Sequence, residues 1–421
     1  MSIITQQAEL LLILACVFGF FMAWGIGAND VANAMGTSVG SGAITLGQAV
    51  VIAGLFEFLG AWLAGGEVTA TISGGLIDPQ VVAGDPHLLV IGMLAALLGA
   101  GTFLVVTSMR GMPVSTGQSI VGAILGFALV AYGAEPVNWG EIGKIAASWV
   151  VSPLLAGALA FLLFESIRRL VFNHPNPAIG ARRYLPAYIF LAAFVICLVT
   201  LLKGLSHIGL ELSTGAGLLG ATALGLLAAG LSALLLQRID LSPAARASDR
   251  FRNVERVFGY AQVFTAATMA FAHGSNDVAN AVGPVAAIIN VLDNPERVGE
   301  SSELAGWVLI LGGVGIVVGL ATYGHRVMRT IGAGITHLTP TRGFSAELAA
   351  ASTVVLATFF GLPVSTTQTL VGGVLGVGMA RGLRALDLSV LRGVFAGWLL
   401  TLPGAALFTA VFYFLLRAVL M

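Results

Sequence analysis

The sequence is poor in charge and nearly free of cysteine. Asp, Glu, Lys and Arg together make up 10% of the 421 residues, whereas a soluble domain carries about a quarter. This shortage excludes a soluble globular protein, and the net charge of zero gives no sign of a nucleic-acid partner. The two cysteines, Cys16 and Cys197, both lie within apolar runs. We therefore expect neither a disulfide framework nor a cysteine metal site.

Hydrophobic residues are what the chain has in excess. They make up 57% of it, and apolar runs of about 20 residues, each long enough to cross a bilayer, recur from one end to the other. This pattern predicts an all-α polytopic membrane protein. About twelve transmembrane segments are expected, near residues 8–28, 43–64, 88–109, 113–132, 141–165, 185–203, 212–236, 255–280, 303–323, 344–360, 363–380 and 391–416.

The basic residues predict the orientation in the membrane. Most of them gather in four loops, which the alternation of the segments places on one side, and by the positive-inside rule that side is cytoplasmic. Both chain termini are then extracellular or periplasmic, and the loop at 65–87 on their side is acidic. The basic residues of the four loops are Arg168, Arg169, Arg182, Arg183, Arg238, Arg246, Arg250, Arg252, Arg256, Arg326, Arg329, Arg342, Arg381, Arg384 and Arg392.

Two motifs occur twice, in the same order and at nearly the same spacing. "NDVAN" begins at Asn29 and again at Asn276, and "PVST" begins at Pro113 and again at Pro363. The first unit starts outside the membrane and the second starts inside, which predicts two inverted-topology repeats, typical of secondary transporters. Channels are also built from such repeats, so the repeat alone does not decide between them. The predicted domains are a first repeat at 1–165, a two-span linker at 166–254 and a second repeat at 255–421.

Each copy of the first motif places an acid and two amides inside an apolar segment. An ionised Asp near the bilayer centre costs about 2.5–3.5 kcal/mol, so we expect these acids to have partners. Carboxylate, amide and backbone carbonyl oxygens suit a desolvated alkali cation, and the neighbouring glycines are expected to let the helix unwind and expose its carbonyls. The structural alternative is that the amides join helices. The predicted sodium ligands are Asn29, Asp30, Asn33, Asn276, Asp277 and Asn280.

The second motif reads as a helix start that carries hydroxyl groups. Proline fits the first turn, which needs no N–H, and a helix N-terminus with hydroxyls suits an oxyanion. An ordinary helix cap is the alternative, but the duplication of this motif together with the acid motif argues against it. The short segments 344–360 and 363–380 are either full spans or a re-entrant helical hairpin with the Ser-Thr turn at its tip. The predicted anion ligands are Ser115, Thr116, Gln118, Ser365, Thr366, Thr367 and Gln368.

Two further acids, Glu57 and Glu347, fall within predicted segments. Intramembrane acids are functional candidates, and we expect both to serve in coupling. His273 precedes the second "NDVAN" and is the candidate for carrying protons. Ile26 stands at the equivalent place in the first repeat, which weighs against that role.

These motifs resemble those of the inorganic phosphate transporter (PiT) family. "GANDVANAMGTSVGSGAITLGQAV" and "GSNDVANAVGP" are similar to its two signature repeats, "GLPVSTTQ" to its second conserved element, and "KIAASWVVSPLLAG" also looks family-like. The resemblance covers nearly the whole chain. It implies sodium- or proton-coupled uptake of inorganic phosphate by twelve helices with both termini outside. It also implies that Asp30, Glu57, Asp277 and Glu347 are acids required for transport.

The chain departs from the family pattern in a few places. The family usually has His after Ser-Thr-Thr, where this chain has Gln118 and Gln368, and Gly117 replaces one Thr. Glutamine does not titrate, so this position cannot relay protons. The basic loop near 237–254 is short, so the large cytoplasmic insert of eukaryotic members is absent.

The residues and the resemblance together predict a sodium:phosphate symporter of the plasma membrane that works by alternating access. Phosphate beside two carboxylates, with no Lys or Arg in the motifs, is repelled unless cations intervene. Sodium ions are therefore expected as co-transported partners, together with the lipid bilayer, with a homodimer considered and no organic cofactor. No metal-ligand cluster or nucleophile–base pair suggests an enzyme. A proton-coupled phosphate or metal-phosphate symporter, a sulfate permease and, with less support, an anion channel stay open.

Overall fold

The computed structural model describes residues 3–82, 84–204, 212–239, 251–293, 305–324, 328, 338–382 and 388–421. Throughout this part the chain is helical, apart from connecting turns and one isolated bridge between Ile77 and Val137. Five of the basic residues used to predict the orientation lie outside the described residues: Arg246, Arg250, Arg326, Arg329 and Arg384.

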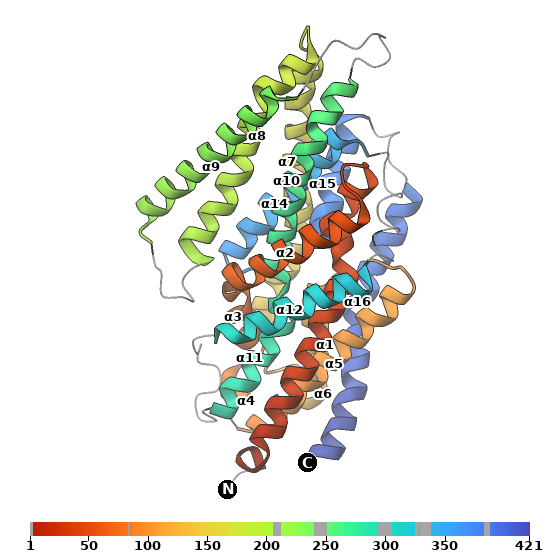
Figure 1. Cartoon of the computed structure of the whole chain (residues 1–421). Helices are drawn as coiled ribbons and strands as arrows, with labels where there is room; N and C mark the ends of the chain where they lie inside the picture. Colours follow the sequence, from red (N-terminus) through yellow and green to blue (C-terminus); the bar gives the residue numbers. More distant parts are fainter. Residues whose placement is uncertain are drawn as a thin grey trace.

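Figure 1 shows the arrangement of the helices. In chain order they are α1 (Ile3–Gly40), α2 (Leu46–Ala64), α3 (Gly66–Gly74), α4 (Pro79–Val82), α5 (Pro86–Met109), α6 (Thr116–Ala131), α7 (Trp139–Ile167) with the π-helical turn η1 (Arg168–Phe172), α8 (Pro177–Val199) with the π-helical turn η2 (Thr200–Gly204), α9 (Thr214–Gln237), α10 (Arg252–Asp277), α11 (Ala279–Asp293), α12 (Gly306–Thr322), α14 (Pro340–Phe359), α15 (Thr366–Ala380) and α16 (Leu388–Leu420).

Every predicted transmembrane segment overlaps a helix of the structure, and the all-α polytopic fold class is confirmed. The helices α1, α2, α5, α7, α8, α9 and α16 are long and apolar enough to cross a membrane, and α6 and α12 are apolar but shorter. The count of twelve spans stays a prediction. The helices α3, α4 and α11 fall where the sequence predicted loops, because they are short or follow directly after a predicted segment.

The expectation that the first motif lies in an unwound helix is wrong. Helix α1 continues without a break to Gly40, and its glycines serve close packing instead. A Cβ on Gly27 would lie 1.9 Å from the backbone oxygen of Ile316, and one on Gly319 would lie 2.0 Å from that of Trp24. Glycine thus lets α1 and α12 approach backbone to backbone. In the second repeat a break does occur, at Val278 between α10 and α11.

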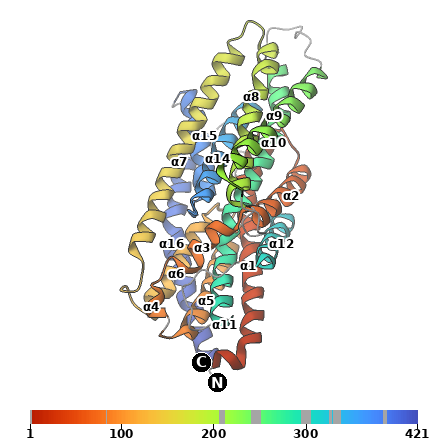
Figure 2. The ribbon, with the colours of Figure 1, turned by 90° about the vertical axis from the view of Figure 1, so that its left-hand side faces the viewer.

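The two repeats run in opposite directions. Both chain termini lie at one end of the molecule, where α1 begins, whereas α10 begins at the opposite end (Figure 1). The hairpin of α5 and α6 occupies the half near the termini, and the hairpin of α14 and α15 occupies the other half (Figure 2). The packing follows the same inversion, because α1 packs on α12 and α5 while α10 packs on α2 and α14. Likewise α6 packs on α16, and α15 packs on α7.

The turns at the two hairpin tips have the same backbone. Gly111 and Gly361, which stand at equivalent places in the repeats, both have φ of +65°, a value that favours glycine. Each turn leads into a helix capped by a serine, Ser115 before α6 and Ser365 before α15. The two tips meet in the interior, which is the arrangement that the predicted re-entrant hairpins require.

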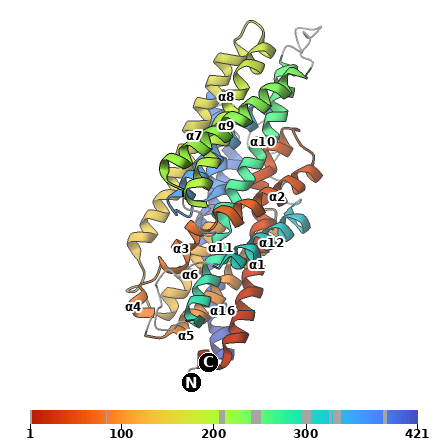
Figure 3. The same ribbon diagram turned by 60° about the vertical axis from the view of Figure 1, so that its left-hand side comes forward.

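The helices α8 and α9, in the segment predicted as a two-span linker, form a pair beside the repeats (Figure 3). Arg182 near the start of α8 donates to Leu236 O at the end of α9, at 2.9 Å. Arg168 donates to Ala380 O at the end of α15, at 3.5 Å. Two arginines of one predicted cytoplasmic loop thus meet helix ends at the end of the molecule away from the termini.

Candidate functional site

The side chain of Asn29 fastens the first hairpin to α1. Its Nδ2 donates to Ser108 Oγ at 2.7 Å and to Met112 O at 3.3 Å, and its Oδ1 accepts from the backbone N–H of Val114 at 3.2 Å. Asn29 is buried, so water does not compete for these bonds. They fix the turn that leads into α6, where predicted anion ligands stand.

Asn276 makes the same three contacts in the second repeat. Its Nδ2 donates to Thr358 Oγ1 at 3.0 Å and to Leu362 O at 3.1 Å, and its Oδ1 accepts from the N–H of Val364 at 3.3 Å. The two duplicated motifs are therefore one structural unit used twice. Asn29 and Asn276 stay predictions as sodium ligands, and the amide groups of both already hold the hairpins.

The acids of the two motifs come together through hydroxyl groups. Thr116 Oγ1 donates to Asp30 Oδ2 at 2.6 Å, and the same oxygen lies 3.3 Å from Asp277 Oδ2. Thr366 Oγ1 donates to Asp277 Oδ2 at 2.8 Å. Asp30 and Asp277 are both buried. Two carboxylates from opposite repeats thus share one hydroxyl at the first hairpin tip.

The second amide of each motif reaches across to the other repeat. Asn33 Nδ2 donates to Asp30 Oδ1 at 2.9 Å and to Thr367 Oγ1 at 2.6 Å. Asn280 Nδ2 donates to Thr116 Oγ1 at 3.4 Å. Because the contacts of Asn33 with Thr367 and of Asn280 with Thr116 each join a motif helix of one repeat to the hairpin tip of the other, the site is complete only when both repeats are folded together.

The helices α6 and α15 begin at this site. The capping hydroxyls of Ser115 and Ser365 accept from the N–H groups of Gln118 and Gln368, each at 3.2 Å. A cap of this kind satisfies the third N–H of a helix and leaves the first two without an intrahelical partner. Both helix starts therefore present backbone N–H groups and partial positive charge beside the carboxylates.

The two glutamines that follow the hydroxyls are also buried. Oε1 of Gln118 and Oε1 of Gln368 lack a hydrogen-bond partner. A buried amide oxygen without a partner is costly. These two groups are the least satisfied of the predicted anion ligands.

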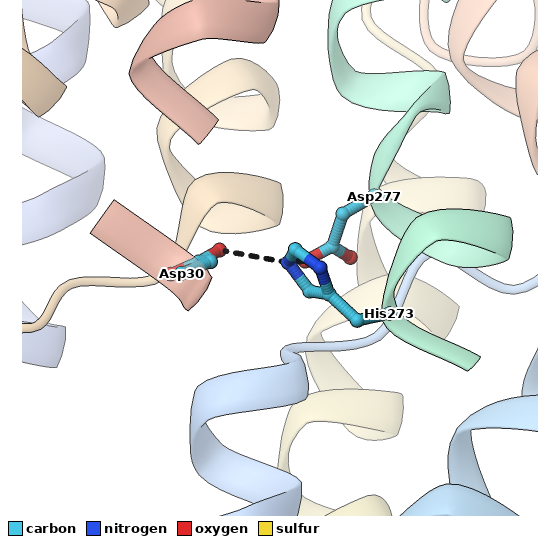
Figure 4. Close-up of side chains that lie close together, drawn as sticks. All are labelled: Asp30, His273 and Asp277. Atoms are coloured by element: carbon cyan, nitrogen blue, oxygen red, sulfur yellow. Dashed lines mark ion pairs between the residues drawn. The ribbon is translucent and has the colours of Figure 1, made fainter. Parts of the chain in front are cut away.

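His273 lies between three acids. Figure 4 shows Asp30 facing the imidazole from α1, while His273 and Asp277 both project from α10. The imidazole Nε2 lies 3.0 Å from Asp277 Oδ2 and 3.7 Å from Asp30 Oδ2, and Nδ1 lies 3.2 Å from Glu57 Oε1. The ligand atoms of Asp30, His273 and Asp277 lie within 4.8 Å of one another, so a single cation could bridge them.

Glu347 forms a separate polar cluster. Its Oε1 accepts from Thr37 and Ser38 of α1, each at 2.5 Å, and from Gln262 of α10 at 3.1 Å. Its Oε2 accepts from Thr265 of α10 at 2.7 Å. This one buried carboxylate therefore ties α14 to the motif-bearing helices of both repeats.

The structure brings most of the predicted residues into one site. The hydroxyls, acids and second amides gather where the hairpin tips meet, and Glu57 joins them through His273. Glu347 lies apart, because its partners Thr37 and Ser38 are two turns along α1 from Asp30. Sequence reasoning missed Ser108 and Thr358, the side-chain partners of the first amides. The equal spacing of these two residues from the "PVST" motif is the signal that could have found them.

Three comparisons place the chain among known proteins. A model of the phosphate transporter family matches residues 26–409. A putative phosphate permease of Haemophilus influenzae is 46% identical over the full length of both chains. Inorganic phosphate transporter 2-1, chloroplastic, of Arabidopsis thaliana is 43% identical over 98% of this chain and 73% of its own length. A solved structure titled "The sodium-dependent phosphate transporter" superposes with a TM-score of 0.91 at 40% identity, covering 97% of this chain and 99% of that one.

The match spans both repeats, so it covers every residue of the site described above. The family and the solved structure are transporters, which agrees with the prediction that the chain is not an enzyme. On these matches, the chain belongs to the phosphate transporter family.

Proposed function

We propose that this phosphate transporter imports inorganic phosphate together with sodium ions, by alternating access of one site at the meeting point of its hairpins. The observation that carries the proposal is that the buried carboxylates Asp30 and Asp277 share the hydroxyl of Thr116 at a helix start. An anion at the two helix starts then lies beside two carboxylates. No Lys or Arg is among the buried residues of the described chain.

Electrostatics supply the coupling. Two like charges repel strongly in a medium of low dielectric constant, so phosphate binds beside Asp30 and Asp277 only when cations offset the carboxylates. We assign the sodium ions to these two acids, with Asn33 and Asn280 beside them. The solved relative whose title names sodium dependence supports this assignment.

The anion is held without a cationic side chain. We assign it to the N–H groups at the starts of α6 and α15 and to the hydroxyls and amides there. Helix starts bind phosphate through such groups, because the N–H groups point at the ligand and the helix dipole favours negative charge. The assigned side chains are those of Ser115, Thr116, Gln118, Ser365, Thr366, Thr367 and Gln368.

Two outlying acids complete the proposal. Glu57 acts through His273, which lies 3.2 Å away and contacts both aspartates. Glu347 couples the repeats by holding α1 and α10 on one carboxylate. With the basic helix ends cytoplasmic, the termini are extracellular or periplasmic and the substrate moves toward the basic side. The homodimer also stays a prediction.

The purified protein in liposomes tests this function. Labelled phosphate uptake is expected to require an inward sodium gradient and to fall when either aspartate is replaced. His273 between three acids favours proton coupling as the second candidate, and uptake driven equally well by a proton gradient without sodium would establish it instead. Stronger competition by sulfate than by unlabelled phosphate would overturn the assignment of phosphate as the substrate.

A further inference from the structure

The two hairpin tips are joined by a side chain from the second tip. Thr367 Oγ1 donates to the backbone oxygen of Val114 in the first tip, at 3.2 Å, and accepts from Asn33 of α1, at 2.6 Å. One hydroxyl thus attaches the second tip both to the first tip and to the opposite repeat. We call this pair of bonds the Thr367 latch.

The equivalent position in the first tip is Gly117. A Cβ at Gly117 would lie 3.3 Å from the backbone oxygen of Val364 and 3.9 Å from Nδ2 of Asn280. Val364 and Asn280 are the counterparts of the partners of Thr367. Both partners of such a latch therefore stand beside Gly117, and Val364 must shift by a few tenths of an ångström to admit the Cβ.

The missing side chain changes the surroundings of Asn280. Asn33 donates both hydrogens of its amide, to Asp30 and to Thr367, at 2.9 and 2.6 Å. Asn280 donates to Thr116 at 3.4 Å, a distance at which a hydrogen bond is weak. The first tip is consequently attached less firmly to α11 than the second tip is to α1.

We propose that Gly117 makes the first hairpin tip (residues 111–118) the one that separates from the opposite repeat when the site opens, whereas the bond from Asn33 to Thr367 keeps the second tip on α1. Gly117 acts through Asn280 and Val364, so it is a positioning residue for binding and release. The effects on transport that we expect of Gly117 rest on the proposed function. A hydroxyl at position 117 would stabilise the closed site by one hydrogen bond, which corresponds to about a threefold to tenfold change in its population.

Substitution at position 117 tests the proposal in the transporter. Gly117→Thr and Gly117→Ser both restore the hydroxyl, and Gly117→Ala adds the Cβ alone. The two hydroxyl variants are expected to bind phosphate about threefold to tenfold more tightly at fixed sodium, and to turn over more slowly by a similar factor. The alanine variant should show neither gain. Unchanged or weaker phosphate binding in both hydroxyl variants would overturn the proposal.

Hydrogen exchange of the wild-type protein tests the asymmetry without reference to transport. The amides of the first tip (residues 111–118) should exchange faster than those of the second tip (residues 361–368), and Gly117→Thr should slow the first tip alone. Equal exchange at the two tips, or faster exchange at the second, would refute the inference. Absence of sodium-dependent phosphate uptake by the wild type would instead count against the proposed function.

Discussion

The amide of Asn33 donates to the hydroxyl of Thr367 at 2.6 Å, across 334 positions of the chain. Asn33 belongs to the long first helix of one repeat, and Thr367 belongs to the hairpin tip of the other. The bond crosses the interface between the repeats at the level of the buried acids. Any motion of one repeat against the other must therefore change this bond, and with it the geometry of the site.

Replacement of Asp30 or Asp277 by Asn should abolish most sodium-driven uptake. Each change removes one of the two charges that we assign to sodium, and keeps the size of the side chain. Labelled phosphate uptake in liposomes is expected to fall by at least about tenfold, since a lost charge-assisted contact is worth about 1.5–3 kcal/mol. Glu141→Gln, at an exposed ion pair with Lys144, is the matched control and should retain wild-type uptake. Full activity in Asp277→Asn would remove that residue from the site.

Sodium and phosphate should raise each other's affinity by the same factor. Sodium offsets the repulsion between phosphate and the carboxylates of Asp30 and Asp277. Linkage then requires that sodium raise the affinity for phosphate by the same factor as phosphate raises the affinity for sodium. Calorimetric titration with phosphate at several sodium concentrations, and with sodium at several phosphate concentrations, measures both factors. Lithium or potassium salt keeps the ionic strength constant while the sodium concentration is varied. A phosphate affinity that does not change with sodium under these conditions would contradict the coupling scheme.

Replacement of Asn29 or Asn276 by Ala should destabilise the folded protein. Each asparagine accepts one backbone N–H and donates two hydrogen bonds to its hairpin, and its loss leaves buried groups without partners. The expected cost is about 1–3 kcal/mol for each unsatisfied group. Thermal unfolding in detergent measures it, and the two variants should shift the midpoint similarly because the contacts are equivalent. Gln237→Ala, on an exposed helix end, should leave the midpoint unchanged.

Glu57 and His273 should behave as one unit. Glu57→Gln and His273→Gln each break the 3.2 Å contact between the two side chains, so the double variant should lose little more sodium-driven uptake than the worse single variant. Residues in contact show such non-additivity, typically 0.5–3 kcal/mol. Uptake by the four proteins of this cycle gives the coupling energy. Strictly additive losses would show that Glu57 does not act through His273.

Replacement of Glu347 by Ala should be more harmful than replacement by Gln. Alanine leaves the hydroxyls of Thr37 and Ser38 without their acceptor, and leaves that of Thr265 with Gln262 O. The amide oxygen of glutamine retains part of the network. The free energy of unfolding is expected to fall in the order wild type, Gln and Ala, by several kcal/mol in total for Ala. The midpoint of thermal unfolding should fall in the same order. Glu9→Gln, at an exposed position of α1, is the control. Equal stability of the Gln and Ala variants would mean that the cluster does not join the helices.

Much of the site could be predicted because its two motifs each occur twice in the sequence. Duplication of "NDVAN" and "PVST" singled out Asp30, Asp277, Thr116 and Thr366, and the structure brings these four together. The role of the first amides could not be predicted. Asn29 and Asn276 have the composition of cation ligands, and only the path of each hairpin tip shows that their amides hold backbone groups.

The sequence by itself determined the membrane class, most of the helices, the inverted repeat and the residue types of the site, because these follow from composition, periodicity and self-similarity. Only the tertiary structure decided which groups meet. It kept α1 helical through its glycines, since close packing against α12 uses them. It brought Glu57 to His273 and gave Glu347 partners on two helices. It also showed that Gly117 faces Val364 O and the amide of Asn280, the counterparts of the two groups that Thr367 contacts. Such contacts depend on long-range packing between opposed repeats, and no local pattern encodes them.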